Sequence, residues 1–285
     1  VDRRRERSAL RRATSESVDP NLTVLHFELD SGGESIIFNY ACHPVCTTPN
    51  ETLLSSGWPG YVYERFKDEF DTVMFINGAA GNINPRDHSL DREGEKVYAY
   101  MKEIGDEIAN TVEKALSSID YGSGFREAPI ISKSIKLPLA VKSTPPVKLL
   151  EQKQEEVEQM IDHDGREPSL HEENDLNYIK ELHNIAKWGA EHIPASVHYL
   201  EVGNIGLISM PGEAFAAHSL CFRRVASVDK LLPAGYANEY VGYIPTLASL
   251  EETGYEVRIS KISPEAIIEF QRTTSNILTH SHPRD

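Results

Sequence analysis

Long apolar runs are absent from this 285-residue sequence, and cysteine and basic charge are both scarce. No run approaches the roughly 20 consecutive apolar residues that a membrane-spanning helix needs, so the chain is not expected to cross a bilayer. The 44 acidic residues outnumber the 29 basic ones and give a formal charge of −15. Such a charge disfavours binding to a phosphate backbone, so nucleic acid is excluded as an expected partner.

The few cysteines also limit the kinds of site that the chain can build. Cys42, Cys46 and Cys221 make an odd count, which argues against a disulfide framework but leaves a single bridge open. Cys42 and Cys46 flank His43, yet a Cys-x3-Cys pair without a second pair is a weak zinc signature. The usual interpretation of such residues is buried, weakly polar packing.

The remaining composition is that of a globular protein. The apolar content of 40% suffices for a core, and the length suits one large domain or two small ones. The first residues lack both an initiator Met and the apolar segment of a signal peptide, so we interpret the sequence as an interior piece of a longer protein.

Residue patterning predicts a mixture of strands and helices in the first part of the chain. Residues 22–29 and 35–41 alternate like the two strands of a hairpin, with a Gly-containing loop between them. The second strand leads directly into His43. Residues 59–70 then show the pattern of an amphipathic helix, and 72–76 that of a short buried strand.

The later part continues in the same way. A long helix is expected over 94–116, a strand over 129–139, and a charged helical hairpin on the surface over 147–192. Two further strands pair around a Gly-Asn turn, and a helix follows over 214–226. Because hairpins, strands and helices are mixed, the sequence predicts a layered α/β or α+β domain with a mixed sheet and flanking helices.

Three short stretches carry side chains that could meet at one metal ion. His43 follows a strand, Glu213 lies between a strand and a helix, and Tyr243 lies in a Tyr-rich segment. Imidazole and carboxylate are ordinary zinc ligands, and a catalytic zinc keeps three protein ligands and an open position. Each residue also has a structural alternative: a hydrogen-bonded histidine, a carboxylate at a helix N-terminus, or an aromatic ring packed beside a turn.

The segment 77–85, Asn-Gly-Ala-Ala-Gly-Asn-Ile-Asn-Pro, is a second candidate for chemistry. Its small residues allow the backbone to approach a ligand closely and to present N–H groups to a developing oxyanion. The alternative is a tight exit from a strand. It is not a phosphate-binding loop, because it lacks the Gly-Lys-Ser/Thr ending.

In this order the motifs resemble the catalytic domain of the neutral/alkaline non-lysosomal ceramidase family. The resemblance extends over almost the whole chain and rests on seven blocks: VDRRR at 1–5, NYACHP at 39–44, LSSGWPGY at 54–61, FINGAAGNINP at 75–85, MPGE at 210–213, NEYVGY at 238–243 and GYEV at 254–257. Each block is short, but their shared order makes chance agreement improbable.

The resemblance implies a function and a set of site residues. The family hydrolyses the amide of N-acylsphingosine with a zinc ion that is held by two His, one Glu and one Tyr and that activates a water. By resemblance, His43, Glu213 and Tyr243 match three of these metal ligands. Arg3 matches an Arg near the substrate, and Gly78 and Tyr240 complete the catalytic candidates.

The chain also departs from the family pattern. The family's other His ligand lies upstream of the region that this sequence covers, although a His in the tail 279–283 is an alternative source. Gly78 stands where characterised ceramidases carry a proposed catalytic Ser, so zinc-activated water is the expected nucleophile. Gly57 replaces an acidic residue, and the family's C-terminal immunoglobulin-like domain is missing. We therefore expect 1–285 to be one catalytic-type domain that is incomplete at its N-terminus.

Three functional hypotheses follow. The first is a zinc-dependent hydrolase of linear amides, acting on a lipid or small-molecule amide. The second is a ceramidase-like module without a competent metal site that binds a partner or serves a structural role. The third is a zinc hydrolase of another ester or amide. The resemblance favours an extracytoplasmic location, and the sequence leaves the oligomeric state open.

Overall fold

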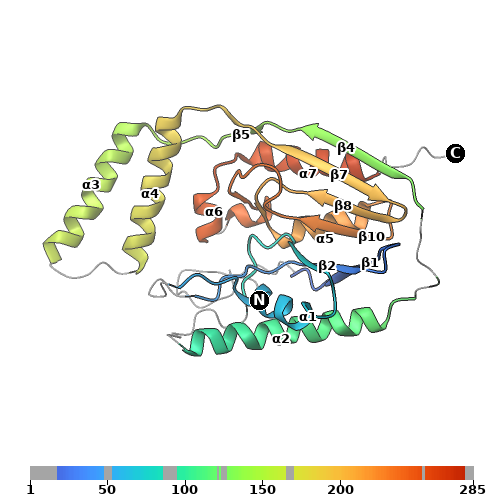
Figure 1. Cartoon of the computed structure of the whole chain (residues 1–285). Helices are drawn as coiled ribbons and strands as arrows, with labels where there is room; N and C mark the ends of the chain where they lie inside the picture. Colours follow the sequence, from blue (N-terminus) through green and yellow to red (C-terminus); the bar gives the residue numbers. More distant parts are fainter. Residues whose placement is uncertain are drawn as a thin grey trace.

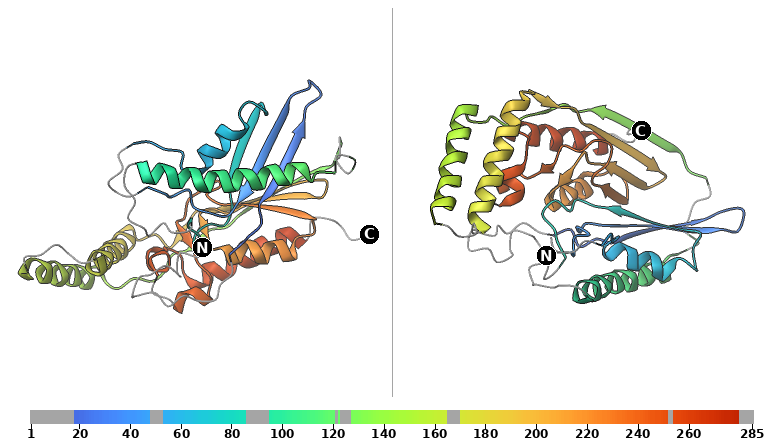
Figure 2. Two further views of the ribbon diagram at one scale, coloured as in Figure 1. Left: turned by 90° about the horizontal axis from the view of Figure 1, so that it is seen from below. Right: turned by 60° about the vertical axis from the view of Figure 1, so that its left-hand side comes forward.

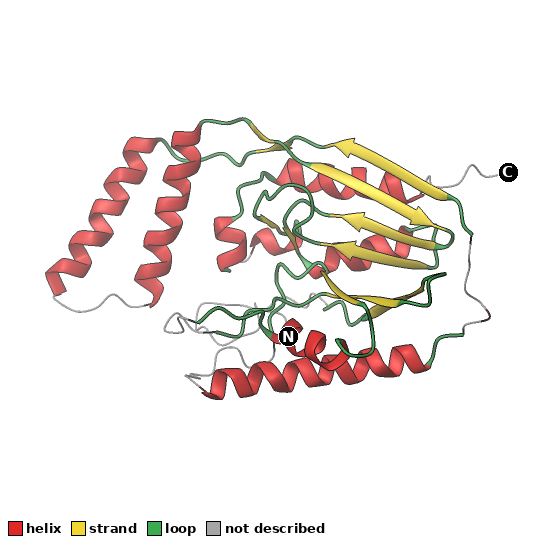
Figure 3. Cartoon of the chain, in the orientation of Figure 1, coloured by secondary structure: helices red, strands yellow, loops and turns green. Residues whose placement is uncertain are grey.

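The structure, a computed structural model, describes residues 18–47, 53–85, 95–120, 122, 127–164, 170–251 and 254–279. The two largest β-sheets of the described residues lie side by side, with helices packed against their outer faces (Figures 1 and 3). One sheet mixes parallel and antiparallel neighbours in the order β1-β2-β3, and the other does so in the order β10-β8-β7-β4. The predicted layered fold with a mixed sheet is confirmed.

The first sheet begins with the predicted hairpin. β1 (Thr23–Glu28) and β2 (Glu34–Tyr40) pair antiparallel across a turn in which Gly32 has a φ of 86°. After α1 (Trp58–Phe66), the chain returns as β3 (Thr72–Asn77), which runs parallel to β2.

The helices α1 and α2 (Glu95–Ser117) cover one face of this sheet (Figure 2). Val97, Met101 and Val112 of α2 are buried, as their helical spacing predicts.

The second sheet is built around the other predicted hairpin. β7 (Ser196–Val202) and β8 (Ile205–Ser209) pair antiparallel, and β4 (Ile130–Lys136) adds to the outer side of β7. The helices α5 (Ala216–Val225) and α7 (Pro264–Thr279) contact each other and pack against this sheet. Their apolar side chains join those of the strands in the larger of the two hydrophobic cores that the described residues form.

Sequence patterning did not identify β10 (Lys230–Ala234), which pairs parallel with β8. Pro233 lies inside this strand and has no backbone N–H to donate, a feature that argues against a central strand. The strand order places β10 at the edge of its sheet, where proline is tolerated.

The remaining elements surround this framework. The helices α3 (Val147–Asp164) and α4 (Leu170–Trp188) occupy the charged segment, pack against each other and project to one side (Figure 1). Four shorter elements, listed in chain order, are β5 (Leu139–Ala140), β6 (His192–Ile193), the 3-10 helix η3 (Ala248–Glu251) and α6 (Tyr255–Ile259). Among the described residues, no helix is both long and apolar enough to cross a membrane.

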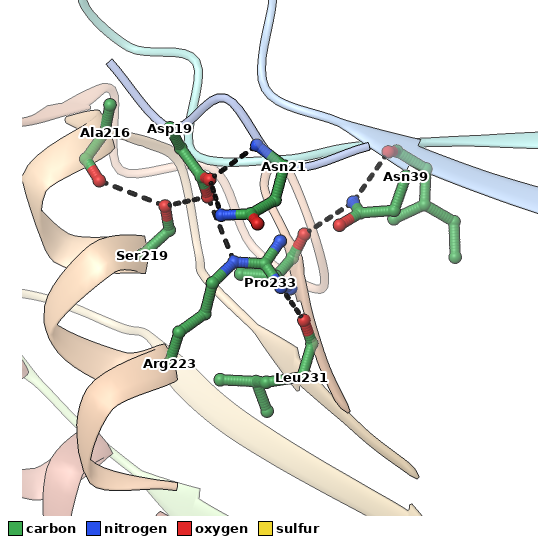
Figure 4. Close-up of polar contacts among 9 residues, drawn as sticks. Asp19, Asn21, Asn39, Ala216, Ser219, Arg223, Leu231 and Pro233 are labelled. Atoms are coloured by element: carbon green, nitrogen blue, oxygen red, sulfur yellow. Dashed lines mark hydrogen bonds and ion pairs between the residues drawn. The ribbon is translucent and has the colours of Figure 1, made fainter. Parts of the chain in front are cut away.

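Polar side chains join the two sheets. Nδ2 of Asn39 in β2 donates to the carbonyl oxygens of Ile76, at 2.8 Å, and Pro233, at 2.9 Å, so it connects β2 to a strand of each sheet. Figure 4 shows this contact beside the buried carboxylate of Asp19. Asp19 accepts hydrogen bonds from Ser219 and Arg223 of α5. These bonds join β2 to β10 and the segment before β1 to α5, the helix that follows Glu213.

Candidate active site

His43 lies three residues beyond β2, and its side chain is fixed by the predicted loop at 77–85. Its backbone N–H and its Nδ1 both contact the carbonyl oxygen of Ile83, at 3.0 and 2.9 Å. Because a carbonyl only accepts, Nδ1 carries the proton in this bond. The carbonyl oxygen of His43 accepts from the Trp58 indole at 3.1 Å. Nε2 is therefore turned away from Ile83 and toward Glu213.

Glu213 forms the short strand β9 (Glu213–Ala214), which runs parallel to β11 (Tyr243–Ile244). Its Oε2 lies 2.8 Å from Nε2 of His43, although 170 residues separate the two in the sequence. Both side chains are almost fully buried. The structure thus brings together two of the three metal ligands that the resemblance implies.

Two phenols complete the cluster. The hydroxyl of Tyr240 donates to Oε1 of Glu213, and that of Tyr236 donates to Oε2 at 3.1 Å. The Tyr236 hydroxyl also lies 3.1 Å from Nε2 of His43. The two tyrosine rings stack with centroids 6.2 Å apart. Tyr240 was among the catalytic candidates, whereas sequence reasoning missed Tyr236.

The hydrogen bonds determine the protonation pattern of this cluster. Burial opposes ionisation of Glu213, but the hydrogen bonds from His43, Tyr240 and Tyr236 hold the pKa of its carboxyl below the ordinary value. Burial, reinforced by the neighbouring Glu213 carboxylate, raises the pKa of both phenols above the ordinary value. Glu213 is therefore an ionised acceptor, and Tyr236 and Tyr240 are neutral donors.

Tyr243, the predicted phenol ligand, lies on β11 directly beside Glu213. Its ring packs edge-on against Tyr255, with centroids 6.1 Å apart, and its carbonyl oxygen accepts from the Ser260 hydroxyl at 2.9 Å. Its role as a metal ligand stays a prediction. Arg3 and residues 280–283 of the tail lie outside the described residues.

The loop at 77–85 has a positioning role in this structure. The N–H of Gly78 donates to the carbonyl of Tyr40, and the N–H of Gly81 donates to that of Ala214, both at 2.9 Å. Since both donors are engaged, neither points to a substrate oxygen in this arrangement. A catalytic contribution of Gly78 stays a prediction. In the structure, Ile83 and Gly81 of this loop contact His43 and the backbone of Ala214, which adjoins Glu213.

The donor chemistry of the cluster fits zinc. Nδ1 of His43 donates to the Ile83 carbonyl, and Nε2 faces the Glu213 carboxylate at 2.8 Å, so loss of the proton between Nε2 and Oε2 would leave two donor lone pairs directed at one position. Two facing acceptors require a proton or a cation between them. A backbone carbonyl on the second ring nitrogen is also typical of metal-ligating histidines.

The number of conventional ligands is lower than in a complete zinc site. Among the residues that the structure describes, no group of three or more His, Cys, Asp and Glu side chains is placed to hold a metal ion. None of the three cysteines, all of which the structure describes, forms a disulfide, and burial raises the pKa of the Cys42 thiol to about 12. A thiol with so high a pKa is a poor source of the thiolate that binds zinc.

Known structures share this arrangement of elements. The chain superposes on neutral ceramidase from Pseudomonas aeruginosa with a TM-score of 0.63 and 18% sequence identity. A second structure, a ceramidase complexed with C2, matches with a TM-score of 0.62 and 15% identity. This chain has the fold of a neutral ceramidase. The expected resemblance is thereby confirmed for the fold.

The match covers nearly all of this chain but only part of its relatives. Each alignment includes 92% of this chain, and the shares of the two ceramidases are 46% and 48%. The chain therefore spans less than half the length of either ceramidase. No model of a known protein family and no curated protein sequence matches it.

A hollow of about 410 Å³ adjoins the cluster on the side of α4 and α6. The Tyr240 ring forms part of its wall, and the hydroxyl of the same residue contacts Glu213. The remaining lining combines the polar side chains of α4 and Lys261 with the apolar surface of Tyr243, Tyr255 and Ile259. The ring of Tyr240 would therefore separate a substrate group in this hollow from the Glu213 carboxylate.

Proposed function

We propose that this chain carries the catalytic centre of a zinc-dependent hydrolase of linear amide bonds. One observation carries the proposal: Nε2 of His43 and Oε2 of Glu213, two ordinary zinc donors, face each other at 2.8 Å in a buried site. The ceramidase fold supports the same chemistry. Hydrolysis adds water across the amide C–N bond and yields a carboxylic acid and an amine.

His43 and Glu213 would hold the metal in this proposal. A zinc ion supplies an activated water and polarises the amide carbonyl. The bond from Nδ1 to Ile83 holds the His43 ring in one orientation and leaves the Nε2 lone pair available. The Tyr240 hydroxyl fixes the orientation of Glu213 through Oε1, and the lowered pKa keeps this carboxylate ionised at neutral pH. Arg3 is the proposed contact of the substrate carbonyl.

The substrate is proposed to be a lipid or small-molecule amide. Solved structures of this fold include proteins named as ceramidases, which favours an N-acylsphingosine-like amide. The hollow beside Tyr240 offers apolar groups from Tyr243, Tyr255 and Ile259 as well as polar groups such as Lys180 and Glu181, so a more polar amide is the alternative substrate.

Zinc content tests this proposal directly. The wild-type chain is expected to hold stoichiometric zinc by elemental analysis, and His43→Ala to hold none. His198→Ala removes an exposed histidine from β7 and serves as the control, so its zinc content should match the wild type. Short-chain N-acylsphingosine and a hydrophilic N-acyl amine, assayed in parallel, then distinguish the two substrate classes.

Two outcomes would count against the proposal. Unchanged zinc in His43→Ala would show that the metal is held elsewhere. Absence of zinc from the wild type would favour the alternative of a binding or structural module with a ceramidase fold.

A further inference from the structure

We infer that Tyr236 is a third ligand of the cation site and binds the metal through its phenol oxygen alongside His43 and Glu213. The inference rests on the proposed function and refines its ligand set, because the family resemblance pointed to Tyr243. This set of three ligands includes no histidine other than His43 from the described residues. On binding, the phenol proton would be released to solvent.

The three donor atoms form a nearly regular triangle. Nε2 of His43 and Oε2 of Glu213 are 2.8 Å apart, and the Tyr236 hydroxyl lies 3.1 Å from each of them. A tetrahedral zinc ion with bonds of about 2.0 to 2.1 Å places its ligand atoms about 3.3 Å apart. The observed triangle therefore approximates one face of such a tetrahedron, with sides about 0.2 to 0.5 Å shorter than in a bound zinc site.

The backbone at Tyr236 adds a second observation. Its φ is 57°, in the left-handed region that a bulky residue rarely adopts. Hydrogen bonds fix this conformation from both sides: the N–H of Tyr236 donates to Gly212, that of Gly235 to Asn77, and that of Ala237 to Met210. Such over-determined strain is concentrated at functional sites, where it fixes a side chain in one place.

The other two phenols are placed differently. The Tyr240 hydroxyl contacts Oε1 of Glu213, the carboxylate oxygen that does not face His43. The Tyr243 ring packs edge-on against Tyr255. The Tyr236 oxygen contacts both predicted ligand atoms, and Tyr240 is a positioning residue for the carboxylate.

Three matched substitutions test this assignment: Tyr236→Phe, Tyr240→Phe and Tyr243→Phe in the full chain. Each keeps the ring and removes one hydroxyl, and far-UV circular dichroism confirms that the variants are folded. Zinc affinity is measured by competition with a chromophoric chelator. A second readout is the visible tyrosinate-to-metal charge-transfer band of protein loaded with Cu²⁺.

Tyr236→Phe is expected to weaken zinc binding by roughly 10-fold to 100-fold or more, because loss of even an outer-shell partner costs that much. It should also abolish the charge-transfer band. The band should persist in Tyr240→Phe and Tyr243→Phe. A band that survives in Tyr236→Phe but disappears in either other variant would overturn the inference.

The two proposals fail in different ways. If zinc binding requires His43 but is unchanged in Tyr236→Phe, the inference is wrong and the proposed hydrolase site stands. If the wild type binds no zinc, or His43→Ala binds it normally, both are wrong.

Discussion

Gly81 illustrates how a residue without a side chain determines the geometry of the site. A Cβ atom added there would lie 2.2 Å from the carbonyl oxygen of Glu213 and 2.9 Å from that of Ala214. Both neighbours are backbone atoms that cannot rotate away. The close contact between the loop at 77–85 and β9 therefore depends on glycine at this position.

Gly81→Ala is predicted to lower the free energy of unfolding by about 1 to 3 kcal/mol, the usual cost of inserting a methyl group into a packed interior. It should also weaken zinc binding, because β9 must shift and carries Glu213 with it. Urea unfolding and chelator competition measure the two effects.

Gly189→Ala is the control for this substitution, since Gly189 has a φ of 63° but open space around it. It should cost about 1 kcal/mol through backbone strain alone and leave zinc affinity unchanged. Equal zinc affinities in the two variants would contradict the role assigned to Gly81.

At the scale of elements, Asp19 attaches the segment before β1 to α5. Its buried carboxylate accepts hydrogen bonds from Ser219, at 2.6 Å, and from Arg223, at 3.1 Å. Burial opposes ionisation of Asp19, but these bonds and the Arg223 charge hold its pKa below the ordinary value. The folded state therefore releases this proton more readily than the unfolded chain does.

This lowered pKa predicts the direction of a pH effect. The stabilisation by Asp19 should be fully present above the ordinary carboxyl pKa of 3.8 and should be lost as the pH falls through the lower pKa of the folded state. At neutral pH, Asp19→Asn should cost about 2 kcal/mol, the scale of a hydrogen-bonded charge. Urea unfolding of wild type and variant should show this difference shrinking toward low pH.

The control for this prediction is Glu64→Gln, which removes an exposed carboxylate of α1 that pairs with Lys67 just beyond the helix. Its unfolding should follow that of the wild type at every pH. A difference between Asp19→Asn and wild type that grows as the pH falls would contradict the prediction.

At the scale of the whole molecule, the candidate site lies where the two sheets meet. His43 follows β2 of the first sheet, and Glu213 follows β8 of the second. Nδ2 of Asn39 bridges the sheets, and the N–H of Gly235 donates to the Asn77 carbonyl at 2.9 Å. The distance between His43 and Glu213 is thus determined by how the sheets are joined.

Asn39→Ala is predicted to cost about 1 to 3 kcal/mol, because two carbonyl groups lose a buried donor. If the sheets unfold as one unit, hydrogen exchange should accelerate in both β3 and β10. Asn204→Ala, which removes an exposed bond to Asp229, should change neither strand. Faster exchange confined to one sheet would show that the sheets unfold separately.

Much of the fold could be predicted from the sequence because its signals are local. The hairpins at β1–β2 and β7–β8 follow from alternation and from glycine turns, and α2 follows from its helical spacing. The strand β10 could not be predicted in this way. Pro233 argues against a strand locally, and the pairing of β10 with β8 depends on a contact distant in the sequence.

The sequence by itself determined which residue types could carry the chemistry: the motifs around His43, Glu213 and Tyr243 named an imidazole, a carboxylate and a phenol. Only the tertiary structure decided that His43 and Glu213 meet, since sheet packing brings together two residues that lie 170 positions apart, and that the Tyr240 hydroxyl contacts Glu213. It also decided that Tyr236 joins them. A left-handed backbone conformation and a shared carboxylate oxygen leave no periodic signal in a sequence, because they arise from contacts among distant segments.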